Sequence, residues 1–231
     1  MTVQLIQHPS PNFGARRHGG QPDIVVLHHT AMLTCAAALE RLCDPVAEVS
    51  AHYLISETGE VYQLVADDQR AWHAGSGAWG NVRDVNSHSI GIELANPGPL
   101  DAAPPFPEPQ MVALEQVLAD ILRRWHIPLA RVIAHSDMAP CRKSDPGEVF
   151  DWRRLALNEL SVWPQPTKMG DFLTDAATFG YCLQDAPEEA ILAAFRLRFR
   201  PGAVGPLTDT ERAMMRDLAT RFAVDLSIGN A

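Results

Sequence analysis

Two apolar stretches of this sequence end in histidine. IVVLHH ends in His28 and His29, and VIAH ends in His135. A loop that contains two prolines follows His135 and carries Asp145. Two histidines and one carboxylate, with a fourth position left to water, are a ligand set of catalytic zinc sites. Side chains alternate along a strand, so only one of His28 and His29 can face such a site, and the alternation does not say which.

Three further residues could take part in this chemistry. A thiolate is a better zinc ligand than a carboxylate, so Cys141 could replace Asp145, and their spacing does not exclude it. Glu93 lies in SIGIEL, on the face opposite to the apolar residues, and could be a general base for an attacking water or a surface charge at the sheet edge. Lys143 could stabilise the oxyanion that forms when hydroxide attacks an amide, or be a solvated loop lysine.

Bulky ring side chains gather just before residue 80. Trp72, His73 and Trp79 could form the wall of a substrate groove. Aromatic side chains more often fill cores. These three residues could therefore lie either in a groove wall or in the core.

Strands and helices must bring these residues together. Hydrophobic patterns predict strands at 23–29, 50–55, 61–65, 89–94 and 131–135, helices at 32–42 and 110–125, and a helical turn at 152–157. The nearly continuous apolar run of the first strand indicates that both of its faces are covered. Strands interleaved with helices predict an α/β fold, with a mixed central sheet flanked by helices.

The two ends of the chain differ from this central part. Residues 1–22 contain three prolines and three glycines and are expected to be irregular. Three helical patterns, at 171–183, 187–199 and 208–222, predict a small three-helix domain at the other end. We therefore divide the chain into a catalytic domain at 1–162, a linker at 163–170 and a helical domain at 171–231.

Composition limits the classes of partner and the compartment. The chain has 231 residues, of which 46% are hydrophobic and 20% charged, and its net charge of −9 disfavours nucleic acid or an anionic membrane as the main partner. No apolar run approaches the ~20 residues of a transmembrane helix, and no signal-peptide pattern is visible. We expect a cytoplasmic monomer with four reduced cysteines, or a periplasmic protein if an export signal was trimmed.

Five motifs, in the right order, carry a family resemblance. VVLHHT, SAHYLI, AWHAGSGAWG, NSHSIGIELAN and AHSDMAPCRKSDPG resemble the zinc-dependent N-acetylmuramoyl-L-alanine amidases of type 2, whose fold is shared with peptidoglycan-recognition proteins. The similarity covers roughly residues 20 to 155. The three-helix segment resembles a peptidoglycan-binding domain, through AILAAFRLRFRPGAVGPLTDTERAMM.

The resemblance implies roles for particular residues. Carried over by position, His28, His135 and Asp145 are the zinc ligands, Glu93 is the catalytic acid and base, and Lys143 stabilises the tetrahedral intermediate. The resemblance thus selects the first histidine of the pair and discounts the cysteine. The residues expected to contact substrate are Tyr53, Trp72, His73, Trp79 and Asn86.

The implied reaction is hydrolysis of the amide between N-acetylmuramic acid, or its 1,6-anhydro form, and L-alanine. The expected cofactor is Zn2+, and the expected partners are muropeptides or the cell wall. Two alternatives are a peptidoglycan-binding module without catalysis and a zinc peptidase that cuts within the stem peptide. A module that only binds would usually lack a metal ligand, whereas Glu93, Lys143 and all three ligands are present here.

Overall fold

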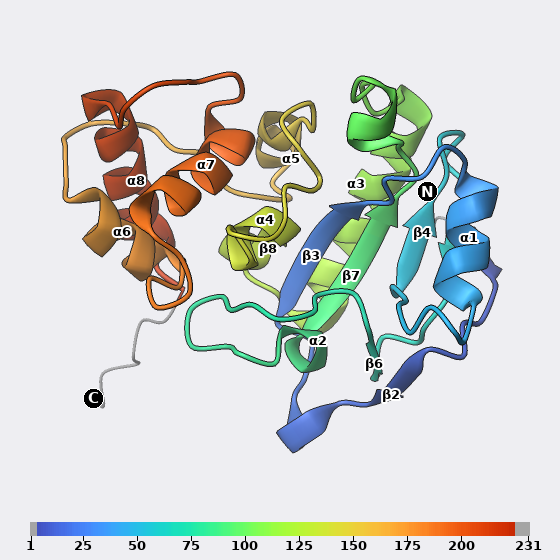
Figure 1. The fold of residues 1–231 in the computed structure, drawn as a ribbon. Helices are drawn as coiled ribbons and strands as arrows, with labels where there is room; N and C mark the ends of the chain where they lie inside the picture. Colours follow the sequence, from blue (N-terminus) through green and yellow to red (C-terminus); the bar gives the residue numbers. More distant parts are fainter. Residues whose placement is uncertain (1–3, 225–231) are drawn as a thin grey trace.

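The computed structural model describes residues 4–224 and places a mixed sheet at the centre of the molecule (Figure 1). The strands are β1 (Leu5–Gln7), β2 (Phe13–Ala15), β3 (Ile24–His29), β4 (Tyr53–Ile55), β5 (Val61–Gln63), β6 (Gln69–Ala71), β7 (Ser89–Leu94) and β8 (Val132–Ala134). Six of them form one sheet in the order β1-β5-β4-β7-β3-β8, in which only β4 and β5 pair antiparallel. β2 and β6 form a separate antiparallel pair.

Helices surround this sheet. They are α1 (Cys35–Cys43), α2 (Val85–His88), α3 (Glu108–Trp125), α4 (His135–Met138), α5 (Trp152–Leu157), α6 (Phe172–Phe179), α7 (Glu188–Phe199) and α8 (Asp209–Phe222). Short 3-10 turns lie at Arg17–Gly19, Gly98–Asp101 and Leu129–Arg131. None of the helices in the described part of the chain is long and apolar enough to cross a bilayer. The predicted α/β fold with a mixed central sheet is confirmed.

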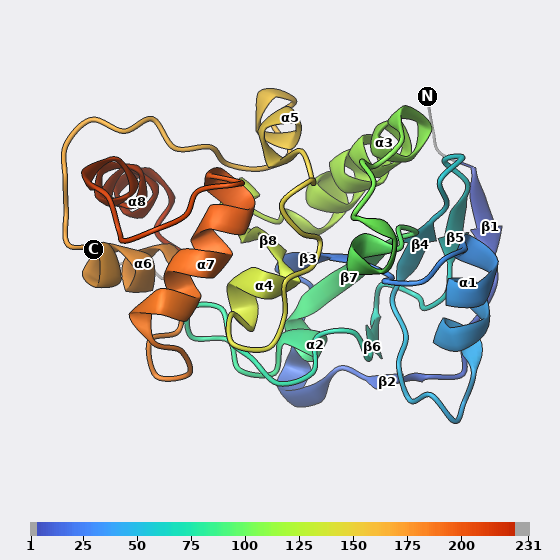
Figure 2. The same cartoon turned by 45° about the horizontal axis from the view of Figure 1, so that its top comes forward.

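The central strand β3 is buried on both faces, as its apolar run predicts. Val25 and Leu27 belong to the same apolar cluster as the buried stripe of α3. Ile24 and Val26 point the other way and belong to the cluster that contains the C-terminal helices. Since side chains two apart share a face of a strand, His28 lies on the same face as these two residues. Figure 2 shows α3, which covers the first face, apart from α6, α7 and α8, which lie on the side of α4.

The C-terminal helices share an apolar core with the sheet. Phe172, Phe179 and Phe195 are fully buried in one cluster with Val26 and Ile133 of the central strands. The apolar core therefore continues across the connection at 163–170. The division of the sequence into two domains stays a prediction, and residues 225–231 of the second one lie outside the described residues.

A buried charged network crosses from these helices to α4. Asp137 of α4 accepts hydrogen bonds from the guanidinium of Arg198 on α7 (2.6 Å) and from the hydroxyl of Tyr181 (2.6 Å). Arg198 is also stacked over the ring of Trp152, 4.4 Å from its centroid. Because breaking a buried ion pair leaves an unpaired buried charge, this network holds α4 against the C-terminal helices.

The N-terminal segment is more regular than predicted. Residues 1–22 were expected to be irregular, but β1 pairs with β5 and β2 pairs with β6. The two N-terminal strands, β1 and β2, are each three residues long, which is too short to show an alternating pattern. Both pair with segments more than 50 residues away, and a local pattern does not report such pairing.

Candidate metal and catalytic site

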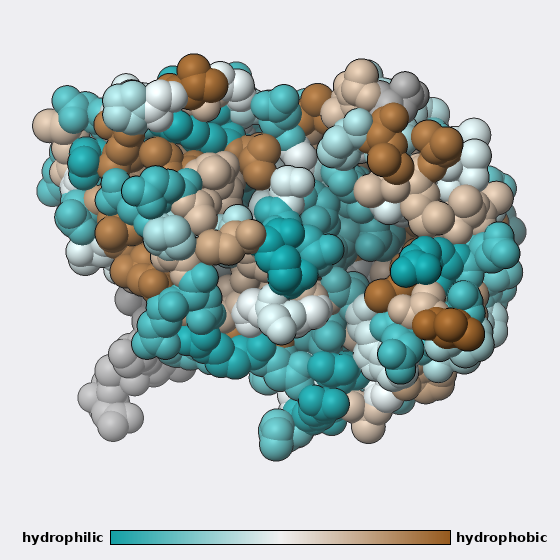
Figure 3. All heavy atoms as spheres, viewed as in Figure 1, coloured by the Kyte–Doolittle hydropathy of each residue, from teal (hydrophilic) through white to brown (hydrophobic). Residues whose placement is uncertain are grey.

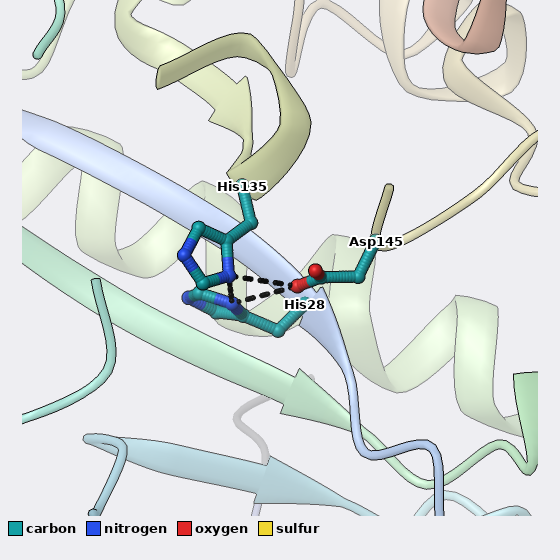
Figure 4. Close-up of side chains that lie close together, drawn as sticks. All are labelled: His28, His135 and Asp145. Atoms are coloured by element: carbon teal, nitrogen blue, oxygen red, sulfur yellow. Dashed lines mark hydrogen bonds and ion pairs between the residues drawn. The ribbon is translucent and has the colours of Figure 1, made fainter. Parts of the chain in front are cut away.

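Three buried side chains converge on one point at the ends of the central strands (Figure 4). Nδ1 of His28 lies 2.9 Å from Nδ1 of His135, and each of these nitrogens lies 3.0 Å from Oδ2 of Asp145. All three residues are buried, and three atoms of this kind facing one another are arranged to hold a metal ion.

The register of the sheet brings the two histidines together. β3 and β8 run parallel, with Leu27 opposite Ala134, so that His28 and His135 follow at the same edge. The loop after α4 then returns to this edge, where the backbone N–H of Ser136 donates to the carbonyl of Asp145 (3.1 Å). The sheet thus places two ligands, and the returning loop adds the third.

The second nitrogen of each histidine is also engaged. Nε2 of His135 lies 2.9 Å from the backbone carbonyl of Ala74, which can only accept a hydrogen bond. Nε2 of His28 lies 3.0 Å from Nδ1 of His73. Bonds of this kind fix the orientation of metal-binding histidines, so the side chains present fit a metal.

The charges of the group also suit a divalent metal. Burial, together with the neighbouring His135, lowers the pKa of His28 to about 4. Burial raises the pKa of the Asp145 carboxyl, but its close contacts with His135 and His28 outweigh burial and hold the pKa well below its usual range. At neutral pH the group therefore offers a carboxylate and a neutral His28 imidazole, the protonation states that metals bind.

Glu93 lies beside the metal-binding group on the adjacent strand. It is the register partner of His28 on β7, so both side chains leave the sheet on one face, as the alternation of SIGIEL predicts for Glu93. Burial and the charge of Asp145 raise the pKa of Glu93 to about 8. Its Oε2 is buried and has no hydrogen-bond partner among the described atoms. A carboxyl with these properties is suited to proton transfer near neutral pH.

The group opens into a cavity of about 460 Å3. In Figure 3 the middle of the surface is hollowed between the C-terminal helices and α1, and many of the residues around the hollow are hydrophilic. Lys143 and Trp72, both half-buried, line the cavity together with His73. The positive charge of Lys143 acts on Glu93, where it opposes part of the rise in the carboxyl pKa. The other lining residues are His28, His29, Thr30, Ala31, Met32, Ala38, Arg41, Leu42, Val49, Ser50, Glu93, His135 and Asp145.

Three residues expected to contact substrate lie elsewhere. Trp79 is completely buried and stacks edge-on against Phe179 and Tyr181, so it is a core residue. Tyr53 is buried as well, and its hydroxyl donates to Asp67, away from the metal-binding group.

The third of these residues, Asn86, binds the backbone of two residues of the site. Its Oδ1 accepts the backbone N–H groups of His73 (3.1 Å) and Ala74 (2.9 Å). Cys141, the alternative ligand, is exposed, with its thiol directed at the carbonyl of Asp185. The structure thus brings together Glu93, Lys143, Trp72, His73 and the three ligands. Tyr53 and Trp79 do not line the cavity, and Asn86 contacts the group through the backbone of His73 and Ala74.

Sequence reasoning missed several contributors to the site. The carbonyl of Ala74 and the hydroxyl of Ser89 each bind a histidine of the site, and Arg41 and Met32 line the cavity. No residue pattern identifies a backbone carbonyl as a partner. The alternation of SIGIEL places Ser89 on the strand face of Glu93, but it does not identify a partner for the Ser89 hydroxyl.

Comparison with known proteins agrees with this geometry. Residues 18–148 match the family described as N-acetylmuramoyl-L-alanine amidase. The chain is 32% identical to the N-acetylmuramoyl-L-alanine amidase AmiD of Escherichia coli (strain K12), over 87% of this chain and 84% of that protein. It is also 32% identical to the 1,6-anhydro-N-acetylmuramyl-L-alanine amidase AmpD of Enterobacter cloacae, over 64% of this chain and 86% of that one. The chain belongs to the N-acetylmuramoyl-L-alanine amidase family and is an amide hydrolase.

Two solved structures extend the similarity to the C-terminal helices. The complex of E. coli AmiD with anhydro-N-acetylmuramic acid-L-Ala-D-gamma-Glu-L-Lys superimposes with a TM-score of 0.80, at 32% identity, over 90% of this chain and 93% of that one. AMPDH3 from Pseudomonas aeruginosa, in complex with anhydromuramic pentapeptide, gives a TM-score of 0.79 at 28% identity, over 94% and 96% of the two chains. The family and fold predicted from the sequence are therefore confirmed.

Proposed function

We propose that this chain uses a zinc ion held by His28, His135 and Asp145 to cleave the amide between anhydro-N-acetylmuramic acid and L-alanine in soluble muropeptides. The observation that carries the proposal is the convergence of three buried ligand atoms inside a cavity that also holds Glu93 and Lys143. Three protein ligands suit a catalytic zinc, since a structural zinc takes four. The anhydro sugar is favoured because the complexes of AmiD and AMPDH3 both contain an anhydromuramic peptide.

The residues of the chain divide the work. Zinc, when bound, would polarise the amide carbonyl and make a water molecule more acidic. Glu93 takes a proton from the attacking water and delivers it to the departing amine of L-alanine, two transfers for which a pKa near neutrality is suited. The ammonium of Lys143 stabilises the negative charge that develops on the carbonyl oxygen.

Trp72 lines the same cavity and contributes an apolar surface to substrate binding. The monomeric state and the compartment expected from the sequence stay predictions.

Product analysis tests the proposal. The protein is incubated with 1,6-anhydro-muramyl-tripeptide and with purified sacculi, with and without a chelator, and the products are identified by mass spectrometry. We expect free peptide that begins with L-alanine, formed faster from the anhydro tripeptide and abolished by the chelator. Cuts within the peptide would instead indicate a zinc peptidase. Intact substrate in every sample, from protein that contains zinc, would indicate a binding module.

A Glu93→Gln variant serves as the matched control. It keeps the shape of the side chain but cannot carry the proton, so we expect normal zinc content and a rate lower by about 10²–10⁴-fold. An active variant would remove Glu93 from the mechanism.

A further inference from the structure

A chain of hydrogen bonds runs from the metal-binding group into the protein. Nε2 of His28 meets Nδ1 of His73 at 3.0 Å, and Nε2 of His73 meets Oγ of Ser89 at 3.1 Å. The same Oγ lies 2.6 Å from the backbone carbonyl of Val85. All three side chains are buried.

The last member gives the chain a direction. The carbonyl of Val85 can only accept, so the single hydrogen of the Ser89 hydroxyl is committed to it. Ser89 Oγ must then accept a hydrogen from Nε2 of His73. A neutral imidazole has one N–H, so Nδ1 of His73 has no hydrogen and accepts from Nε2–H of His28. Nδ1 of His28 is therefore left with its lone pair directed at the point it shares with Asp145.

Packing holds the ring of His73 in this position. The ring lies against Gly91 so closely that a Cβ there would come within 2.4 Å of its Cγ. On the other side, Asn86 accepts the backbone N–H groups of His73 and Ala74. The absence of a side chain at 91 thus makes the room that the ring occupies.

We propose that His73 is a positioning residue that fixes the tautomer of His28, with Ser89 as the residue that sets the direction of the hydrogen bonds. His135 reaches the same state through the carbonyl of Ala74, which no substitution of a side chain removes. The two histidines therefore present equivalent nitrogens to the metal through different supports. The inference rests on the proposed zinc site but not on the identity of the substrate.

Zinc affinity measured by competition with a chromophoric chelator tests this role. We expect His73→Ala to weaken zinc binding by about 10–100-fold, the usual cost of losing the partner of a metal-binding histidine. His73→Asn should recover most of the loss, because its Oδ1 can accept from His28 in place of Nδ1. Equal affinities of His73→Ala and the wild-type protein would overturn the proposal, and so would an Asn variant no better than the Ala variant.

Two serine variants distinguish the loss of the Ser89 hydrogen bond from a general effect of removing a buried hydroxyl near the site. Ser89→Ala removes the hydroxyl that accepts from His73 and should weaken zinc binding several-fold. Ser136→Ala is the matched control, since its hydroxyl is buried beside His135 but has no partner among the described residues. We expect it to bind zinc as the wild type does. Equal losses in both variants would overturn the role of Ser89.

The tautomer itself can be observed. Long-range 1H–15N spectra of the zinc-loaded protein should show His73 with its hydrogen on Nε2 and none on Nδ1. The opposite tautomer would overturn the proposal even if every variant failed to fold. Because no substrate is present in these measurements, they can succeed when the amidase assay fails, and the assay can succeed when they fail.

Discussion

The two histidines of the site are held by different regions of the molecule. His28 ends β3, which pairs with strands on both sides, and its ring is directed by side chains of nearby strands and loops. His135 begins the single turn α4, whose Asp137 is bound by Arg198 and Tyr181 from the C-terminal segment.

The first support comes from the sheet and the loops around it, whereas the second depends on a helix more than 60 residues further along the chain. The C-terminal helices are therefore part of the scaffold of the site, whatever else they bind.

The largest effect should come from the ligand that both histidines share. Asp145→Ala removes the carboxylate that lies 3.0 Å from each ring. We expect the loss of zinc affinity to exceed the ~100-fold cost of losing a ligand's partner. Zinc content after dialysis measures it. Cys141→Ala, which removes an exposed thiol, is the control and should retain its metal. Loss of zinc from the cysteine variant alone would reverse our ligand assignment.

Breaking the support of α4 should reduce stability. Arg198→Met leaves the carboxylate of Asp137 buried without its ion pair, which costs about 3–5 kcal/mol. Denaturant unfolding of the metal-free protein measures the change. Arg153→Met, an exposed arginine on α5, should stay within about 0.5 kcal/mol of the wild type. If the two variants were equally stable, the C-terminal helices would have no part in holding α4.

On the side of His28, burial of the Glu93 carboxyl should make stability depend on pH. The pKa of Glu93 is raised from 4.5 to about 8, so between these values the folded metal-free protein keeps a proton that the unfolded chain releases. Stability relative to Glu93→Gln should therefore fall as pH rises towards 8, by at most ~1.4 kcal/mol per pH unit. Unfolding curves at several pH values measure it. Glu40→Gln, exposed on α1, should follow the wild type, and parallel curves for both variants would contradict the burial of Glu93.

The smallest change separates the contributions of Tyr181 and Arg198, the two side chains that bind Asp137. Tyr181→Phe removes the hydroxyl that donates to Asp137 but leaves the ion pair with Arg198. We expect a loss of about 1 kcal/mol, the usual net value of one hydrogen bond, again by denaturant unfolding. A loss as large as that of Arg198→Met would show that the hydroxyl, rather than the charge, holds α4.

Local patterns predicted the elements that have strong periodicity. The apolar run of β3, the alternation of β7 and the amphipathic stripe of α3 were each identified nearly to the residue. The alternation also placed Glu93 on the correct face. The short strands β1 and β2 were missed, because their existence depends on pairing with distant segments.

The site was predictable only in part, for a related reason. The geometry places His28, not His29, beside Asp145, a choice that the alternation alone left open. Trp79 and Tyr53, two rings within the motifs, were predicted to contact substrate, yet both are buried in the core. Contacts between residues far apart in the chain, such as Arg198 with Asp137, leave no mark in a local pattern.

The position of Arg198 has a consequence for the order in which a ribosome completes this protein. Synthesis proceeds from the N-terminus, so the three metal ligands, His28, His135 and Asp145, leave the ribosome before α7 does. The nascent chain therefore carries every ligand before it carries the guanidinium that secures α4. A zinc ion that binds during translation would therefore bind a site in which α4, the helix of His135, does not yet have its ion pair with Arg198.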